Sequence, residues 1–339
     1  MRSELMFDSL DGLSVGDSLG QQFPVMRRSI QDIRGGNLAA GPWEWTDDTE
    51  MACTVVAELG ARGAIDQDRL AAAFARRFDP GRDYGFIAVS TLRRIQGGAP
   101  WREVAGAAYD GQGSCGNGAA MRVAPLGAYY ADDPKRIVAE AVRSAQVTHM
   151  HPEGVAGAVA VALAAGRAAQ ARLTGIRPTP TEFITAVLDN LGNGETSRRI
   201  RHARTLLGAS AEQAAAELGN GSRVTAQDTV PFTMWVAATH LGDYPSAITT
   251  CIAADGDIDT TSAIVGGIVA AYTGTAPSTG TAPSTGTAPG TGTGIPPTWL
   301  AAREPLPTWL TPPRSPRRKS PRRRWLSRTN QPPAPPASR

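Results

Sequence analysis

An alanine-rich run between Val155 and Ala171 restricts the folds that this chain of 339 residues can adopt. Alanine has the highest helix propensity of the amino acids, and the run contains few β-branched residues. No uninterrupted apolar run of transmembrane length appears in the chain. The composition therefore predicts helices that pack closely against one another through small side chains.

Helical spacing of apolar residues recurs along most of the chain before residue 274. The predicted helices cover residues 6–19, 46 to Gly60 or Gly63, 67–78, 87–95, a long segment from 152, and then 183–191, 197–207, 211–218, 231–240 and 260–272. The alternation of apolar and polar residues that is typical of β-strands is absent. We therefore predict an all-α domain over residues 1–274, followed by segments of different composition.

Three cysteines, Cys53, Cys115 and Cys251, lie far apart and form no Cys-x-x-Cys pair. This spacing is typical of a reduced compartment and indicates neither a disulfide framework nor a zinc site. Acidic residues at Glu4 and Asp8 fall where a signal peptide would need an apolar stretch. We therefore predict a cytoplasmic protein that does not bind membranes.

The chain changes character after residue 274. Residues 275–294 repeat a Gly/Thr/Pro/Ser unit that cannot bury apolar surface, which predicts a flexible linker. Residues 295–311 contain Pro-Thr-Trp-Leu twice and could dock their tryptophans on the domain. Residues 312–339 are rich in Pro, Arg and Ser and are predicted to be disordered.

Basic charge is concentrated at the C-terminal end. Residues 303–339 carry a net charge of +9, so the remainder of the chain carries −6 within the total of +3. This tail could attract nucleic acid weakly and in a salt-dependent way. We favour a solvated tail without specific contacts, and an altered reading frame near the end of the gene would give the same composition.

Two acidic clusters far apart in the sequence are candidates for a functional site. The first is Trp45-Thr46-Asp47-Asp48-Thr49 and the second is Asp257-Ile258-Asp259-Thr260. Each could simply cap a helix, because Thr and Asp accept hydrogen bonds from free backbone N–H groups. If the clusters meet in a partly buried cleft, however, their four carboxylates need cations to neutralise them. Oxygen donors suit magnesium, manganese or calcium, and capping does not exclude such binding.

Five short motifs follow one another along the chain. They are Gly16-Asp17-Ser18-Leu19-Gly20, Thr46-Asp47-Asp48-Thr49, Gly113-Ser114-Cys115-Gly116-Asn117-Gly118-Ala119-Ala120-Met121-Arg122, Thr148-His149 and Gly256-Asp257-Ile258-Asp259-Thr260. In this order and spacing they resemble the ADP-ribosylglycohydrolase family, which includes the dinitrogenase reductase-activating glycohydrolases. The resemblance covers residues 5–274 and extends to 295–300. Each motif alone is weak evidence, whereas their joint order is specific.

This resemblance implies a compact, orthogonal helical bundle with two Mg²⁺ ions in a cleft, where Mn²⁺ can substitute. It further implies hydrolysis of the glycosidic bond that joins ADP-ribose to a protein side chain or a small acceptor. The bound metals would orient the ribose and make water more acidic. Asp48 or Asp83 would take the proton from the attacking water. The metal ligands carried over onto this sequence are Thr46, Asp47, Asp48, Asp257, Asp259 and Thr260.

The resemblance also implies a substrate-binding loop. Its glycines allow backbone N–H groups to approach phosphate oxygens, and a helix starting after Asn117 would add its positive end. Arg122 could touch the phosphate or brace the start of that helix, and the pattern leaves both open. The residues implied to contact ADP-ribose are Gly113, Ser114, Gly116, Asn117, Gly118, Met121 and His149.

One stretch departs from the family pattern. Many relatives have a glutamate a few residues after the Gly-Asp-x-x-Gly motif, where it acts as a mobile metal ligand or gate. This chain has Gln21-Gln22-Phe23-Pro24 there. The substitution leaves the six metal-ligand positions intact but puts the gating step and the acceptor preference in doubt.

Two other functions fit parts of the pattern. The first is a non-enzymatic protein of the same fold, with a crystallin-like structural role or with ADP-ribose binding alone. The second is a metallohydrolase of phosphate esters, which the lack of a His ligand disfavours. The sequence does not specify the acceptor, so arginine, serine, a nucleic-acid end and O-acetyl-ADP-ribose all stay open. We expect a monomer.

Overall fold

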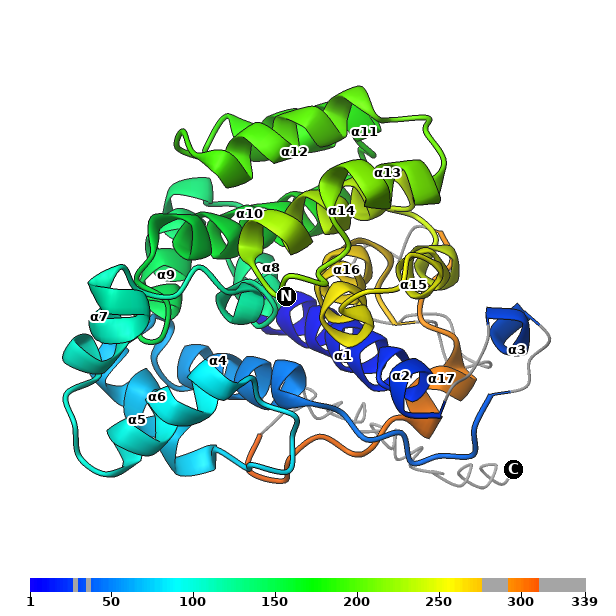
Figure 1. Ribbon diagram of the computed structural model, residues 1–339. Coiled ribbons are helices and arrows are strands. Elements are labelled where there is room, and N and C mark those ends of the chain that lie inside the picture. Colours follow the sequence, from blue (N-terminus) through cyan, green and yellow to red (C-terminus); the bar gives the residue numbers. More distant parts are fainter. Residues whose placement is uncertain (27–29, 35–37, 276–291, 311–339) are drawn as a thin grey trace, which may run out of the picture.

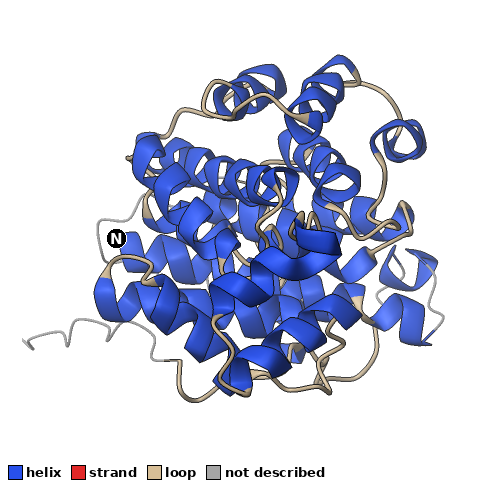
Figure 2. Cartoon of the chain, turned by 60° about the vertical axis from the view of Figure 1, so that its left-hand side comes forward, coloured by secondary structure: helices blue, strands red, loops and turns tan. Residues whose placement is uncertain are grey.

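The structure is a computed structural model that describes residues 1–26, 30–34, 38–275 and 292–310 (Figure 1). Within these ranges the chain forms helices and no β-strand, with isolated backbone bridges between loops (Figure 2). The predicted all-α fold is therefore confirmed. In chain order the helices are α1 (Arg2–Gly20), α2 (Gln22–Met26), α3 (Ile30–Arg34), α4 (Asp47–Arg62), α5 (Gln67–Arg77), α6 (Phe86–Gln96), α7 (Trp101–Gly111), the 3-10 turn η1 (Asn117–Ala119), α8 (Ala124–Tyr129), α9 (Pro134–Gln146), α10 (Pro152–Thr174), α11 (Pro180–Leu188), α12 (Glu195–Thr205), α13 (Ala211–Leu218), α14 (Ala226–Thr239), α15 (Tyr244–Ala253), α16 (Ile258–Thr273) and α17 (Pro297–Ala302).

The first and last long helices, α1 and α16, lie side by side in the centre of the molecule (Figure 1). Their contact is unusually close because glycines face it. A Cβ atom on Gly12 would lie 2.4 Å from the backbone oxygen of Gly266, and one on Gly16 would lie 2.2 Å from that of Ser262. Only glycine fits at such an approach. The contact brings the end of α1 against the start of α16, where the second acidic cluster lies.

Helix α10 confirms the long helix expected from residue 152. Its side-chain cap is His151, which accepts a hydrogen bond from the backbone N–H of Glu153. Length and composition alone would allow α10 to cross a membrane, yet 78% of its most apolar window is buried inside the described fold. The alanines of this helix are core residues that let it pack tightly against α8, α9, α14 and α16.

Several helices were not predicted from the spacing of apolar residues. Among them α9 and α15 share a start signal, an aspartate cap followed by proline in the first turn. Asp133 accepts from the N–H of Arg136, and Asp243 accepts from the N–H of Ser246. Helix α14 begins at Ala226 rather than at Pro231, so this proline lies inside the helix instead of opening it.

The segment 295–310, here named the C-terminal strap, returns to the chain just before the first acidic cluster. Trp43 donates its backbone N–H to the oxygen of Ala302, and Glu304 donates its backbone N–H to the oxygen of Trp43. Trp299 is buried beside Tyr244. Most of the repeat expected to form a linker (276–291) and the basic tail (311–339) lie outside the described residues.

Candidate functional site

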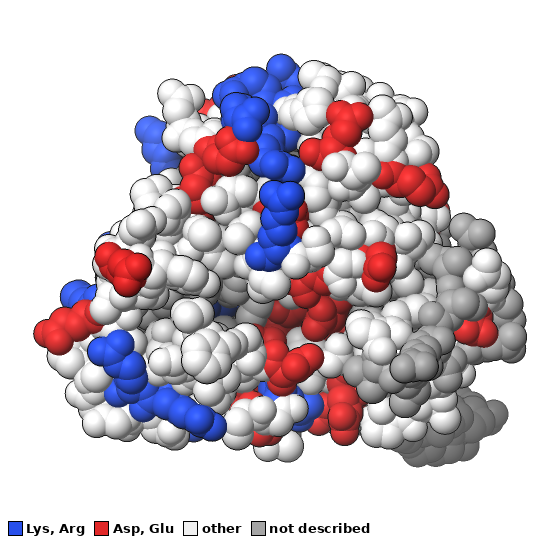
Figure 3. Space-filling view, viewed as in Figure 1, with Lys and Arg blue, Asp and Glu red and all other residues white. Residues whose placement is uncertain are grey.

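A cleft of about 810 Å³ opens where α4, α6 and α16 meet Gln21, the residue after α1, and the glycine-rich loop 113–118. Acidic side chains gather around a hollow in the middle of this face (Figure 3). All the residues predicted to bind substrate line the cleft except Gly113, which is buried behind it. Of the predicted metal ligands and catalytic residues, Asp47, Asp83, Asp257, Asp259 and Thr260 line the cleft.

The first acidic cluster forms the N-terminus of α4. Thr46 is the helix cap and accepts a hydrogen bond from the N–H of Asp48 at 3.3 Å. Beneath it lies Asp17, whose carboxylate accepts from the backbone N–H and the hydroxyl of both Thr46 and Thr49. The capping interpretation is confirmed for this cluster but not for the second, whose Asp257 makes no side-chain cap hydrogen bond, and the geometry leaves Asp48 Oδ2 available for another ligand.

The second acidic cluster lies directly opposite. Asp257 caps α16 without a side-chain hydrogen bond to that helix, and its Oδ2 atom accepts from the Asn117 amide at 2.6 Å. The Thr260 hydroxyl reaches Asp48 Oδ1 at 3.4 Å, which links the two clusters. Carboxylate oxygens of Asp17, Asp48 and Asp259 all lie within 4.8 Å of one another. The structure therefore assembles both predicted clusters into one site.

Charge in this site is not balanced by the protein. Burial and the neighbouring Asp259 raise the pKa of Asp17 to about 7, and the same two causes raise the pKa of Asp257 to about 8. Burial and Asp17 raise the pKa of Asp48 well above its usual range. Among the described residues, no ion pair involves any carboxylate of the two clusters or Asp17.

The donor atoms fit hard divalent cations. Asp48 Oδ2 is buried and has no hydrogen-bond partner in the described part of the chain, as expected of an atom that binds a cation. Its neighbours offer carboxylate and hydroxyl oxygens and no sulfur or imidazole, the donor set that Mg²⁺ and Mn²⁺ prefer. The residues that could hold such ions are Thr46, Asp47, Asp48, Asp257, Asp259 and Thr260.

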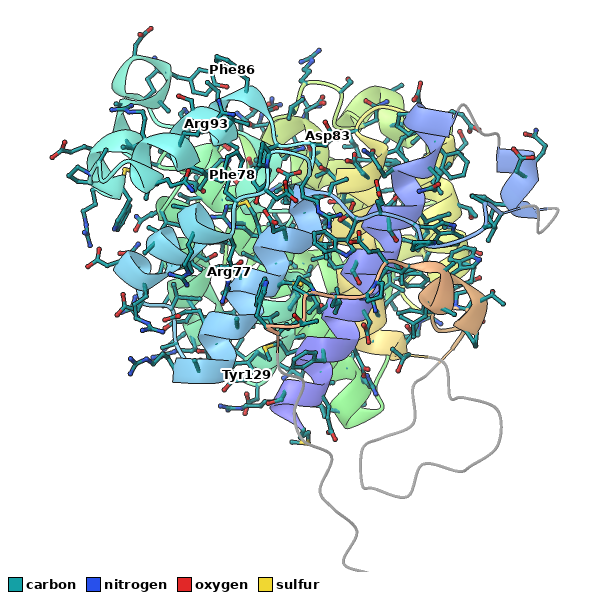
Figure 4. The ribbon with its side chains drawn as sticks, turned by 90° about the horizontal axis from the view of Figure 1, so that it is seen from below. Arg77, Phe78, Asp83, Phe86, Arg93 and Tyr129 are labelled. Atoms are coloured by element: carbon teal, nitrogen blue, oxygen red, sulfur yellow. The ribbon has the colours of Figure 1, made fainter. Side chains whose placement is uncertain are left out.

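Asp83 lies at the acidic end of the cleft, over the ends of α1 and α4, with Phe86 farther out at the rim (Figure 4). Its backbone has a φ of 61°, a strained conformation for a residue other than glycine. Gln21 holds the side chain by donating its amide to Asp83 Oδ2 at 3.2 Å. Gln21, the first residue of the stretch that departs from the family pattern, therefore contacts Asp83, which the sequence analysis gives as a catalytic candidate.

The loop that holds Asp83 is fixed from behind by Arg82. Its guanidinium binds both carboxylate oxygens of Glu304 in the C-terminal strap, at 2.7 and 2.8 Å, and lies over the ring of Trp45. Its backbone oxygen accepts from the N–H of Asp47 at 2.7 Å. One arginine thus connects the strap, the Asp83 loop and the first acidic cluster.

The glycine-rich loop forms the opposite wall of the cleft. Asn117 begins only the short turn η1 rather than an α-helix, so the predicted helix start after Asn117 is wrong, because the chain makes one turn and re-enters a helix at Ala124. The Asn117 N–H donates to the oxygen of Val224, and that of Gly116 donates to the Ser114 hydroxyl. The loop is therefore held by backbone pairing instead of by helix geometry.

Arg122 lies behind this loop and is fully buried. It donates to the backbone oxygens of Gly118 and Ser144, at 3.3 and 2.7 Å, and to the Thr148 hydroxyl at 2.9 Å. Burial lowers the pKa of Arg122 to about 9. The sequence left open contact with phosphate or bracing of a helix start after Asn117; because no α-helix starts there, Arg122 braces the loop itself.

Sequence reasoning missed two sets of residues. Asp17 was noticed only as part of the Gly-Asp-x-x-Gly motif, and no role was given to it, although an acidic residue inside a helix of small residues was a usable signal. The exposed side chains of Phe86, Tyr109 and Val224 also line the cleft. They lie outside the five motifs, and nothing in the sequence pattern marked them.

Similarity to known proteins extends over the whole domain. The family model for ADP-ribosylglycohydrolase matches residues 4–313. ADP-ribosylhydrolase ARH3 of Gallus gallus is 30% identical over 315 residues, which cover 78% of this chain and 84% of that protein. The ADP-ribosyl-[dinitrogen reductase] glycohydrolase of Rhodospirillum rubrum is 30% identical over 154 residues, covering 42% of this chain and 50% of that protein. The solved structure of an ADP-ribosylglycohydrolase-related protein complex has the same fold, with a TM-score of 0.53, 23% identity, and coverage of 89% of this chain and 93% of that one.

Proposed function

Because this chain belongs to the ADP-ribosylglycohydrolase family and is therefore a glycohydrolase, we propose that it depends on magnesium and releases ADP-ribose from modified protein side chains or small acceptors. Relatives named for hydrolysis of ADP-ribosyl linkages support the substrate class. Both walls of the cleft also fit this substrate, since one offers carboxylates for divalent cations and the other is lined by glycines that let a ligand approach the backbone closely.

The observation that carries the proposal is the uncompensated charge of the acidic wall. Asp48 offers a buried oxygen without a partner, and Asp257 and Asp259 lie within hydrogen-bonding reach of each other with raised pKa values caused first by burial. Buried carboxylates that lie side by side do not stabilise a fold, because repulsion and desolvation both oppose it. Two bound Mg²⁺ ions would supply the missing positive charge and polarise ribose oxygens and water.

Asp83 is our candidate for the group that takes a proton from the attacking water. It is exposed to the cleft, whereas Asp48 is buried at the start of α4 and suits ligation better. The Gln21 amide holds Oδ2 of Asp83, which leaves Oδ1 free to accept a proton. A transition state that develops positive charge on the ribose would gain from the surrounding carboxylates.

The first test is release of free ADP-ribose from arginine-linked, serine-linked and nucleic-acid-linked substrates and from O-acetyl-ADP-ribose, in magnesium and in chelator. We expect magnesium-dependent release from one linkage, which would also identify the acceptor. Asp83→Asn should lower turnover while ADP-ribose and magnesium binding persist. Stoichiometric magnesium binding without release from any substrate would favour the non-enzymatic alternative, and hydrolysis of a phosphate ester alone would replace the proposal.

A further inference from the structure

Three residues behind the glycine-rich loop form a short hydrogen-bonded chain. The guanidinium of Arg122 lies 2.9 Å from the Thr148 hydroxyl, which in turn lies 2.7 Å from Nδ1 of His149. All three side chains are at least nine-tenths buried. Because Thr148 and His149 are neighbours in sequence and Arg122 comes from the end of the loop, the chain connects the loop to the segment that precedes α10.

The direction of each hydrogen bond follows from the chemistry of the groups. Arginine has only donors, so the Thr148 oxygen must accept from Arg122. The threonine hydroxyl then has its single proton to donate, and the acceptor within reach is Nδ1 of His149. A ring nitrogen that accepts a hydrogen bond carries no proton, so the proton of the neutral imidazole lies on Nε2. The arrangement thus specifies one of the two neutral tautomers.

The Nε2 edge of the ring faces the cleft. A Cβ atom on Gly118 would lie 3.2 Å from this nitrogen, and one on Gly116 would lie 3.3 Å from it. Both glycines therefore leave the edge uncovered, and within the described residues Nε2 makes no hydrogen bond. An N–H group that is directed into a cleft without a protein partner is available to an oxygen of a ligand.

We propose that Arg122 and Thr148 are positioning residues that hold His149 as a neutral Nε2–H donor to a ligand oxygen at the glycine-rich wall. Identifying that oxygen as part of ADP-ribose rests on the proposed function, whereas the tautomer does not. Burial and the charge of Arg122 also lower the pKa of His149 to about 3, which agrees with an uncharged ring.

The arrangement gives a role to an arginine that is fully buried beside the glycine-rich loop. Among the described residues, no ion pair involves Arg122. Its Nη atoms donate to the backbone oxygens of Gly118 and Ser144 and to the Thr148 hydroxyl. Arg122 therefore acts on a ligand through the loop and through His149, and its own contacts stay inside the protein.

Nitrogen-15 NMR of the full-length protein with labelled histidine tests the tautomer directly, since the chain has only four histidines. The His149→Gln variant identifies the signal. We expect an Nε2–H tautomer in the wild type, loss of this fixed pattern in Thr148→Val, and its recovery in Thr148→Ser. The matched control is Thr250→Val, which removes a hydroxyl 3.3 Å from Nε2 of His240 and should change only the His240 signal.

Calorimetric titration with ADP-ribose tests the donor role. Thr148→Val should weaken binding about three- to tenfold, the loss expected for one hydrogen bond, and Thr148→Ser should restore it. An Nδ1–H tautomer or a charged ring in the wild type at neutral pH would overturn the proposal, as would Thr148→Val with unchanged His149 signals. If the NMR pattern is found but the wild type does not bind ADP-ribose, the ligand assignment and the proposed function fail. The hydrogen-bonded chain of Arg122, Thr148 and His149 then still stands.

Discussion

The acidic wall of the cleft and the glycine-rich wall opposite it meet a charged ligand in different ways. Asp17 and the two acidic clusters use side chains that the protein leaves without counter-charge. The glycine-rich wall is formed by glycines and a neutral histidine, and Arg122 is buried beside the loop with its Nη atoms hydrogen-bonded to the protein.

This difference indicates that the two walls depend on different partners. The proposed function makes the acidic wall dependent on cations, because its buried carboxylates repel one another. The glycine-rich wall is held in place by the protein itself, because its loop makes hydrogen bonds to Val224, Ala226 and Arg122. Substitutions in the acidic wall should therefore change the affinity for metal ions. Substitutions in the glycine-rich wall should change the fit, and so the affinity, of the ligand.

The largest effect is expected for Asp257→Asn. Removal of this charge should abolish magnesium binding and turnover together, with a loss of activity greater than about 100-fold, because metal ions contribute several kcal/mol to such reactions. Calorimetric magnesium titration and the release assay measure both. Asp255→Asn is the control, since Asp255 lies in the same loop but is exposed and should be replaceable. Full turnover of the Asp257 variant would refute the role of the acidic wall.

Metal-free protein should lose stability as pH rises. The pKa of Asp17 is about 7 and that of Asp257 about 8 in the fold, against 3.8 as the ordinary value. The folded chain then binds more protons than the unfolded chain, so the free energy of unfolding decreases between about pH 4 and pH 8. We expect the melting temperature in chelator to fall by several degrees over this window, and magnesium to remove most of the fall. A pH-independent curve in chelator would contradict the charge imbalance.

A smaller effect is expected for Gly118→Ala, which tests whether the glycine-rich wall acts independently of the acidic wall. Gly118→Ala places a Cβ atom 3.1 Å from Cε1 of His149, so the ring must shift by a few tenths of an ångström. We expect ADP-ribose affinity to fall about tenfold while magnesium affinity is unchanged. Gly60→Ala is the control, because nothing lies within 4 Å of its added Cβ atom. Equal losses of both affinities would show that the walls are not independent.

The smallest effect is expected for Glu304→Gln in the C-terminal strap. Loss of the charge-assisted pair with Arg82 should reduce stability by about 1 kcal/mol and turnover a few-fold, because Arg82 holds the Asp83 loop against Asp47. Thermal unfolding and the release assay measure these changes. Asp132→Asn breaks an exposed pair with Arg2 and should cost less than about 0.5 kcal/mol. If the two variants behave alike, the strap does not support the site.

Sequence reasoning was most successful for features that a single short stretch of the chain reveals. The alanine-rich run became α10, and the acidic clusters were recognisable because each gathers two carboxylates and a hydroxyl within a few residues. Helix α9 was missed although Asp133 and Pro134 mark its start, because attention to apolar spacing outweighed the capping signal. The all-α fold was therefore predictable, and the exact helix count was not.

Other features could not be read from the chain because they depend on distant partners. Asp17 meets Thr46 and Thr49 only after α1 and α4 pack together. The tautomer of His149 depends on Arg122, and the support of Asp83 depends on Gln21 and on the strap. Such contacts are set by tertiary packing, and no local pattern encodes them.

The close contact between α1 and α16 has a consequence for protein synthesis. The carboxylates of Asp17 and Asp259 belong to one acidic group, yet the ribosome makes them at opposite ends of the domain. A nascent chain that has not reached residue 259 cannot complete the group, however well its earlier helices fold. If this group binds the metal ions of the proposed function, metal capture and hydrolysis must wait until the domain is almost entirely translated.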